Sequence, residues 1–238
     1  MKASLGCLAR LFVVLIALGC VQSLYATSYN VVTGFSSATN PNGVWTYDYN
    51  GAAYSNSQGY SSLSSIGLPG WWSGEPVPNS LVILQNVTGS TVSYLTVRDP
   101  TNTLWMDPES GSVSVVLTAP STGTYKISGA FLGIDIDENS HPVEILDNGS
   151  IVWSGTISSF SQHDSFSFLE TFNAGSTITF YVGTGSSGCS YCFLSTGLQG
   201  TITAGGTATT PEPGTLILLG SGLFGLVFMF RARHFVRS

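Results

Sequence analysis

The sequence predicts an all-β domain, an antiparallel two-sheet β-sandwich of jelly-roll type, and three observations predict it. Between residues 27 and 203, apolar residues alternate with polar ones at a period of two, as in Ser112-Val113-Ser114-Val115. The same region is rich in Ser, Thr, Gly, Asn, Val and Tyr, which suits short strands and tight turns. No stretch of it carries a convincing helical period. Many short strands separated by turn-forming residues are typical of a β-sandwich.

Ten segments of this region show the strand pattern, and an eleventh, 193–203, is a weaker candidate. The ten are 28–35, 43–49, 81–88, 91–97, 112–118, 123–132, 142–147, 151–157, 164–172 and 176–182. Asp147-Asn148-Gly149 stands between two of them. Because Asn and Gly accept a positive φ, this tripeptide predicts a tight hairpin turn.

The N-terminal segment 1–26 is predicted to be a secretory signal peptide. Lys2 and Arg10 form its positive region, an apolar run follows from Leu11, and Ala26 is the expected cleavage point. An uncleaved anchor is the alternative, although about eleven apolar residues are few for a membrane span. Ala17-Leu-Gly-Cys20 also loosely matches a lipoprotein box.

The C-terminal segment 211–238 is predicted to pass through a membrane once. A flexible linker, 204–210, leads to Pro211-Glu212-Pro213, an uncharged run follows over 214–230, and a basic end over 231–238 contains Arg231, Arg233 and Arg237. A helix over that run would be about 26 Å long, enough for a bacterial hydrocarbon core. Because basic residues stay on the cytoplasmic side, residues 27–203 are expected to form an ectodomain outside the cytoplasm.

This order of Pro-Glu-Pro, one membrane span and a short basic end resembles the PEP-CTERM sorting signal. The resemblance implies processing by an exosortase, a membrane-embedded cysteine transpeptidase of Gram-negative, exopolysaccharide-producing bacteria. The enzyme would cut near Pro211-Glu212-Pro213. The chain would then be a single-pass inner-membrane intermediate before it reaches the cell surface or the extracellular space. An ordinary tail anchor that is never cut is the alternative.

The region ahead of the tail also resembles a domain that often precedes PEP-CTERM tails. The matching stretches are Asn40–Tyr47, Leu68–Trp71, Ala119-Pro120, Gly123–Phe131, Asp147–Gly149, Ala174-Gly175, Ile178–Phe180 and Thr196–Leu198. Asp107-Pro108-Glu109 departs from the His-Pro-Gly of relatives. The resemblance implies a jelly-roll-like sandwich of unassigned activity, similar in outline to carbohydrate-binding modules, and it implies no enzyme.

Charge excludes one class of partner. Between residues 27 and 203 the chain contains twelve Asp and Glu residues and only two Lys and Arg residues, Arg98 and Lys126. The net charge of this region is therefore −10. Nucleic-acid affinity rests on Lys and Arg that neutralise phosphates. Nucleic acid is therefore not an expected partner.

Aromatic residues are the first candidates for a ligand site. Trp71 and Trp72 lie in a Gly- and Pro-rich stretch, and an exposed ring there could stack on the apolar face of a sugar. The alternative is that these rings are part of the core, since large aromatic side chains are usually mostly buried.

Two further pairs of residues are a weaker candidate for a calcium site and a candidate for a structural disulfide. Asp135 and Asp137 would point the same way at a strand end, an arrangement that could collect oxygen ligands for calcium, although no full loop motif is present. Cys189 and Cys192 are the only cysteines left once the signal is removed, and an oxidising compartment favours a small structural disulfide between them.

No catalytic motif is present, and no cofactor other than calcium is expected. There is no Gly-x-Ser-x-Gly elbow, no HExxH and no phosphate loop. The leading hypothesis is an exported surface or matrix protein whose ectodomain contacts exopolysaccharide. Its rivals are a structural matrix protein without a ligand and a weak polysaccharide hydrolase, which would need two carboxylates facing each other across a groove.

Overall fold

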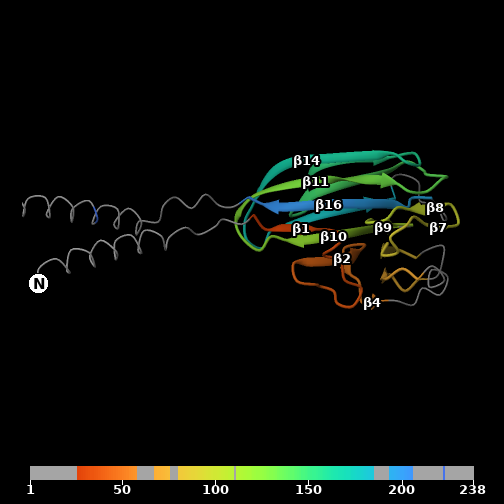
Figure 1. Ribbon diagram of the computed structural model, residues 1–238, viewed down its shortest axis with the longest axis horizontal. Helices are drawn as coiled ribbons and strands as arrows, with labels where there is room; N and C mark the ends of the chain where they lie inside the picture. The colour runs from red at the N-terminus through yellow and green to blue at the C-terminus, as the bar shows by residue number, and fades with distance from the viewer. Residues whose placement is uncertain are drawn as a thin grey trace, which may run out of the picture. The chain divides into compact units, whose positions relative to one another are not determined.

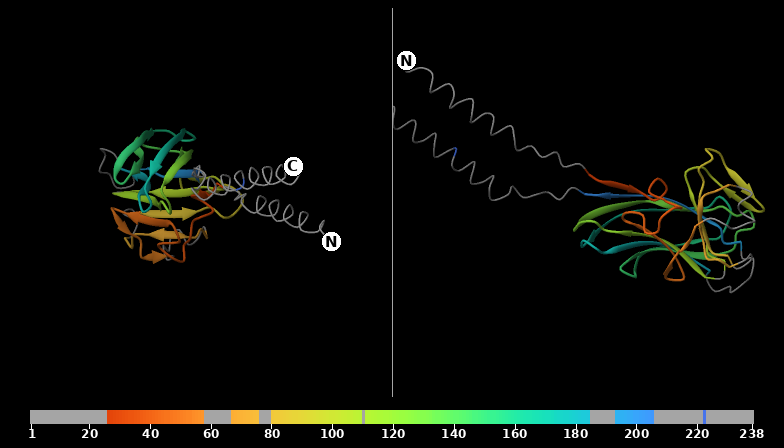
Figure 2. Two further views of the ribbon diagram at one scale, coloured as in Figure 1. Left: turned by 90° about the vertical axis from the view of Figure 1, so that its left-hand side faces the viewer. Right: turned by 90° about the horizontal axis from the view of Figure 1, so that it is seen from below.

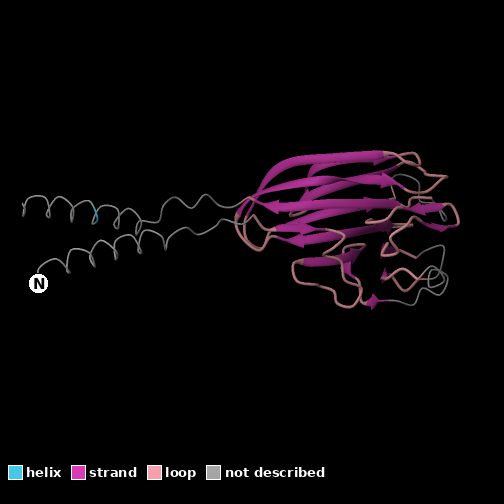
Figure 3. Cartoon of the chain, in the orientation of Figure 1, coloured by secondary structure: helices cyan, strands magenta, loops and turns pink. Residues whose placement is uncertain are grey.

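In the computed structural model the described residues are 26–57, 67–75, 80–109, 111–184, 193–205 and the single residue 222. Strands provide the regular structure from residue 28 to residue 204 (Figure 3). Two large antiparallel sheets contain most of them, so the predicted all-β two-sheet sandwich is confirmed.

The first sheet, sheet A, is built around the long strand β16, which Figure 1 shows between β11 and β1. From edge to edge it contains β14 (His163–Phe172), β11 (Gly123–Gly133), β16 (Thr196–Ala204), β9 (Leu104–Asp107), β6 (Val82–Gln85), β5 (Gly70–Trp72) and β4 (Asn56–Ser57). β1 (Ser28–Asn30) also pairs with β16.

The second sheet, sheet B, contains the predicted hairpin. Its order is β13 (Ser150–Ile157), β12 (His141–Asp147), β15 (Thr177–Gly183), β10 (Ser112–Thr118), β2 (Trp45–Tyr49) and β3 (Ala52–Ala53). Asn148 and Gly149 join β12 to β13 with φ angles of 45° and 84°. Two successive residues with positive φ match the twist of the flanking strands, which confirms the turn prediction.

The main core lies between the two sheets and follows from the period-two pattern. Val113, Val115 and Leu117 of β10 are fully buried, and they pack with alternate residues of β15 and β11. Successive side chains of a strand point to opposite faces, so one face of each strand supplies the core.

Sheet A also carries a smaller second core on its outer face. Leu104 and Met106 of β9 belong to the main core, whereas Trp105 between them packs with Val82, Leu84, Val97, Leu132 and Ile134. A hairpin of β7 (Val92–Tyr94) and β8 (Val97–Asp99) contributes to this cluster and bridges to Asp135. The yellow segments in the right-hand view of Figure 2, which include this hairpin, gather at one end of the domain. The hairpin covers the outer face of sheet A at that end.

The sequence prediction missed the short strands β3 (Ala52–Ala53), β4, β5 and β9, joined β7 to the start of β8 as one strand over 91–97, and made the first strand too long. β5 has three residues and β9 has four, and both contribute apolar side chains to two cores, which hides the alternation. The first strand ends at Asn30 because the side-chain Oδ1 of this residue accepts hydrogen bonds from Val32 N and Thr33 N, both at 2.9 Å. Such a bond pattern turns the chain.

Residues 1–25 of the predicted signal peptide, 1–26, and all of the predicted tail, 211–238, except residue 222 lie outside the described residues. Among the described residues no helix is both long enough and apolar enough to cross a membrane. The predicted span over 214–230 therefore stays a prediction.

Candidate functional site

The candidate site lies where two strands share one edge of β16. β9 pairs with Thr196–Leu198, and β1 pairs with Thr201–Thr203. Between them, at Gln199 and Gly200, the chain from β1 turns away through Val31–Thr33, after Val31 N has donated to Gly200 O at 3.0 Å. The change of partner leaves a step in the outer face of sheet A.

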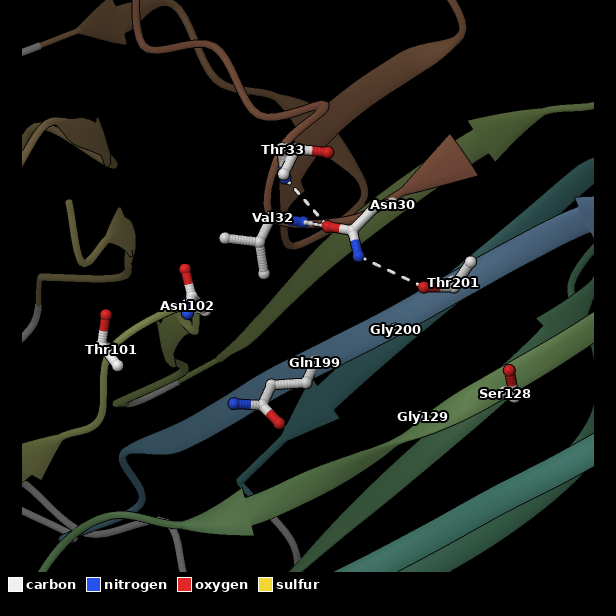
Figure 4. A pocket seen from close by; sticks show the side chains of 10 residues that line it. All are labelled: Asn30, Val32, Thr33, Thr101, Asn102, Ser128, Gly129, Gln199, Gly200 and Thr201. Carbon is white, nitrogen blue, oxygen red and sulfur yellow. Dashed lines mark hydrogen bonds between the residues drawn. The ribbon is translucent and has the colours of Figure 1, made fainter. Parts of the chain in front are cut away.

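A groove of about 470 Å³ occupies this step (Figure 4). Its lining residues come from the turn after β1, the segment between β8 and β9, and the middle of β11 and β16: Asn30, Val32, Thr33, Thr101, Asn102, Ser128, Gly129, Gln199, Gly200 and Thr201. None of these ten residues is charged or aromatic.

Hydrogen bonds to neighbouring side chains orient two side chains that line the groove, Thr201 and Gln199. Asn30 Nδ2 donates to Thr201 Oγ1 at 3.2 Å, while Asn30 Oδ1 is used by the turn (Figure 4). Gln199 Nε2 donates to Thr103 Oγ1 at 3.2 Å, and Thr103 is fully buried. The hydroxyl proton of Thr201 and the carbonyl oxygen of Gln199 therefore remain for a ligand, as a donor and an acceptor held in fixed positions.

The wall beside Thr101 is fixed from behind by a buried asparagine. Asn86 Nδ2 donates to Ser90 O, Asp99 O and Pro100 O at 2.9, 2.9 and 3.1 Å. Only 3% of Asn86 is exposed, so these bonds are shielded from water. Shielded side chain–backbone bonds of this kind hold the segment that precedes Thr101 in place.

The aromatic candidates lie away from this groove, on opposite faces of β5. Trp71 is 3% exposed, belongs to the main core, stacks on Tyr47 with ring centroids 6.3 Å apart, and donates from Nε1 to Ser36 O at 2.7 Å. Burial raises the pKa of Tyr47 to about 12. Trp72 is half-buried and packs against the second core. Trp71 is therefore a core residue, as the alternative interpretation expected, whereas the side chain of Trp72 is still partly exposed to solvent.

The calcium candidates Asp135 and Asp137 do not point the same way. Asp135 is 2% exposed, whereas Asp137 is exposed. Asp135 Oδ1 accepts from Asp137 N at 2.9 Å, and Oδ2 accepts from Thr96 Oγ1 at 3.0 Å. Within the part of the chain that is described, no three His, Cys, Asp or Glu side chains are arranged to hold a metal ion. The expected shared orientation was wrong because Asp135 closes a turn; whether the chain binds calcium stays untested.

Asp135 is part of a group of titratable side chains at the end of the sandwich. Burial raises the pKa of Glu138 to about 9 and that of Asp107 to about 6. His141 Nδ1 lies 2.8 Å from Asn139 O and 3.6 Å from Glu138 Oε1, and His141 Nε2 lies 2.6 Å from Thr196 Oγ1. Burial lowers the pKa of His141. Glu138 Oε1 has no hydrogen-bond partner among the described residues, and the contact of His141 with Thr196 joins β12 to β16.

The remaining predicted site residues cannot be placed. Cys189 and Cys192 lie outside the described residues, and so do Pro211, Glu212, Pro213, Arg231, Arg233 and Arg237. The disulfide and the sorting motif therefore have no structural account.

The groove residues were missed by the sequence reasoning, although one signal could have found part of them. In β16 the inward residues Leu198, Gly200 and Ile202 alternate with the polar Gln199, Thr201 and Thr203. Assigned as a full strand, this segment shows a polar outer face. Nothing in the sequence, however, shows that Asn30 and Thr101 lie beside it, because strand pairing brings them together.

Comparison with known proteins identifies the tail. A model described as the PEP-CTERM protein-sorting motif matches residues 209–233. The chain therefore carries this sorting motif, which implies exosortase-processed export to the cell envelope or surface. The match covers the tail alone, and no curated protein matches the chain.

Solved structures with some likeness to the chain include family 35 carbohydrate-binding modules, carbohydrate-active enzymes and a Pika GITRL. A family 35 module from Clostridium thermocellum is 14% identical over 52% of this chain and 86% of that one, with a TM-score of 0.32. A CBM35 from Paenibacillus barcinonensis is 12% identical over 75% and 98%, with a TM-score of 0.30. A GH26-CBM35 β-(1,4)-mannanase from Podospora anserina is 14% identical over 52% and 26%, with a TM-score of 0.31. The fold rests on the strand pairing above, and these likenesses add nothing to the site.

Proposed function

We propose that the chain is an exported surface or matrix protein, sorted by an exosortase through its PEP-CTERM tail, whose ectodomain binds a neutral polysaccharide in the groove on sheet A. One observation carries the binding half of this proposal. The groove is lined only by uncharged residues, most of them with amide or hydroxyl side chains, on a domain whose charge is strongly negative.

Sugar hydroxyls both donate and accept hydrogen bonds, and so do the side chains of the groove. The acceptor of Gln199 and the donor of Thr201 lie on one strand, two residues apart on the same face. Neighbouring hydroxyls of a sugar ring could satisfy both at once. Because the two side chains are already held by Thr103 and Asn30, little side-chain entropy is lost on binding.

The electrostatics favour a ligand without charge. An acidic polysaccharide would meet a domain balance of −10 and a groove without a cation. Arg98 is turned to its own backbone, donating to Leu95 O and Val97 O at 2.7 Å. Lys126, on β11 beside the groove, is exposed and is the one other basic residue of the ectodomain.

The geometry favours binding without hydrolysis. None of the groove-lining residues carries a carboxyl group, and glycoside hydrolysis needs a pair of them beside the scissile bond. The lining also has no aromatic ring for stacking, so affinity rests on hydrogen bonds, each of which contributes about 0.5–1.5 kcal/mol. We therefore expect weak, reversible binding of the kind that suits a matrix protein with many contacts.

A glycan array tests the proposal directly. The full-length chain, purified in mild detergent, is applied to neutral gluco-, manno- and galacto-oligosaccharides and to uronate-rich ones. Binding should favour the neutral set. Thr201→Val, which removes one hydroxyl at constant shape, should weaken binding about 3- to 10-fold.

Thr156→Val on β13 is the matched control, because Thr156 is exposed on sheet B, and it should leave binding unchanged. No binding to any neutral sugar would refute the binding half of the proposal. If the protein preferred uronate-rich sugars and Lys126→Met abolished this preference, the proposal that the ligand is uncharged would be refuted.

The sorting half has its own test. In a host with an exosortase, the mass of the mature protein should correspond to cleavage near Pro211-Glu212-Pro213. A mature form that still contains Leu216–Phe230 would show that the segment remains as an anchor. Replacing Pro211-Glu212-Pro213 with three alanines should block processing and leave the chain in the membrane fraction.

A further inference from the structure

A single row of polar side chains crosses sheet A and passes through the groove. The strand register places Asn30 of β1 opposite Thr201 of β16, Thr201 opposite Ser128 of β11, and Ser128 opposite Ser167 of β14. Residues opposite each other in antiparallel strands point to the same face. The four side chains therefore form one line across four strands, on the outer face.

The groove contains only part of this row. Asn30, Thr201 and Ser128 line it, whereas Ser167 lies beyond it on the edge strand β14 and is exposed. Neighbouring strands are about 4.8 Å apart, so the row is about 14 Å long. One strand spacing is close to the length of one sugar unit in an extended β-1,4-linked chain.

An exposed apolar side chain flanks the outer end of the row. Leu169 follows Ser167 by two residues on the same face of β14, and it is 68% exposed. Its cross-strand partner is Lys126, whose stem is also apolar. The core makes no use of Leu169, which stands beside serines and threonines. An apolar contact next to a hydroxyl row suits the C–H face of a sugar ring.

We infer that the site takes an internal stretch of a polysaccharide chain that runs across the strands, from the groove over Ser128 to Ser167 and Leu169 at the sheet edge. This inference rests on the proposed function, since it specifies the ligand of the same site. It excludes a single sugar or a chain end as the intended ligand, because such a ligand would fill the groove and leave Ser167, the outer end of the row, unused.

The test compares chain lengths on the full-length protein. Calorimetric titration uses β-1,4-linked gluco- and manno-oligosaccharides of two, four and six units. In the natural sequence, affinity should rise at least tenfold from two units to six. Ser167→Arg, which blocks the outer end of the row beyond the groove, should abolish that gain and leave the affinity for two units unchanged. Leu169→Ser should reduce the gain several-fold.

Two comparisons keep the outcomes separate. Ser154→Arg, at an exposed serine on the edge strand of sheet B, controls for the added charge and should change nothing. Equal affinity for two and six units, or a length gain that survives Ser167→Arg, would overturn the inference while leaving the proposed function intact. If no oligosaccharide of any length binds, the proposed function itself fails, and the inference fails with it.

Discussion

At the scale of single residues, the paired tryptophans show how far a sequence can be read. Their adjacency on a strand implies that the two rings point to opposite faces. Which face is the core cannot be read from the residues themselves, because β5 lies between a main core and a second core. A surface position was one of the two possibilities for Trp71, and the structure instead places its ring in the core.

Replacement of each tryptophan by alanine should separate the two environments. Trp71→Ala removes a fully packed ring and a hydrogen bond to Ser36 O, so the free energy of unfolding should fall by about 3–5 kcal/mol. Trp72→Ala should cost clearly less, because Trp72 is half-buried. Urea denaturation of both variants measures this. Equal losses would contradict the assignment of the two rings.

The buried carboxyl of Asp99 predicts how stability depends on pH. Asp99 is fully buried, and both of its carboxyl oxygens lack a hydrogen-bond partner within the described part of the chain. Burial raises its pKa from 3.8 to about 8. Because the folded state holds the proton more tightly, the stabilisation is complete below about pH 4 and is lost as pH rises towards 8.

Between pH 5 and pH 8 this group alone should lower the free energy of unfolding by about 1.4 kcal/mol per pH unit. Asp99→Asn keeps the shape and cannot ionise, so its stability should fall less steeply over that range. The remaining slope belongs mainly to Glu138, whose pKa burial raises to about 9. Thermal unfolding at pH 5 and pH 8 measures both proteins, and identical slopes would show that Asp99 is not buried.

At the scale of elements, the regular strands could be predicted and the site could not. β14 alternates over its ten residues and β15 over most of its seven, so one face of each is clear from the sequence. The groove depends on where β1 stops and β9 begins along β16. That junction is set by pairing between residues about ninety or more positions apart in the chain. Local pattern carries no signal for such contacts.

Asn30 connects the end of β1 to the groove, and its replacement should affect both. Asn30→Ala removes the acceptor for Val32 N and Thr33 N and the donor to Thr201. We expect a loss of about 1 kcal/mol in stability and a 3- to 10-fold loss in affinity for neutral oligosaccharides. Asn173→Ala, at an exposed asparagine in the turn before β15, is the control. If Asn30→Ala left the affinity unchanged, Asn30 would stabilise the turn without contributing to sugar binding.

At the scale of the whole molecule, charge and sorting agree with residence outside the cytoplasm. An excess of ten negative charges over residues 27–203 keeps copies of the domain apart and soluble. The PEP-CTERM motif over 209–233 implies delivery to the envelope or surface. The proposed neutral ligand accords with this charge, because uncharged residues line the groove on sheet A.

The central claim is that this groove is where the polysaccharide binds. Hydrogen–deuterium exchange on the full-length chain, with and without a saturating neutral hexasaccharide, tests its location. The account predicts slower exchange for backbone amides that line the groove, at residues 30–33 and 101–102. Protection confined to the β5 segment around Trp72, or no protection at the groove when the sugar is bound, would contradict it.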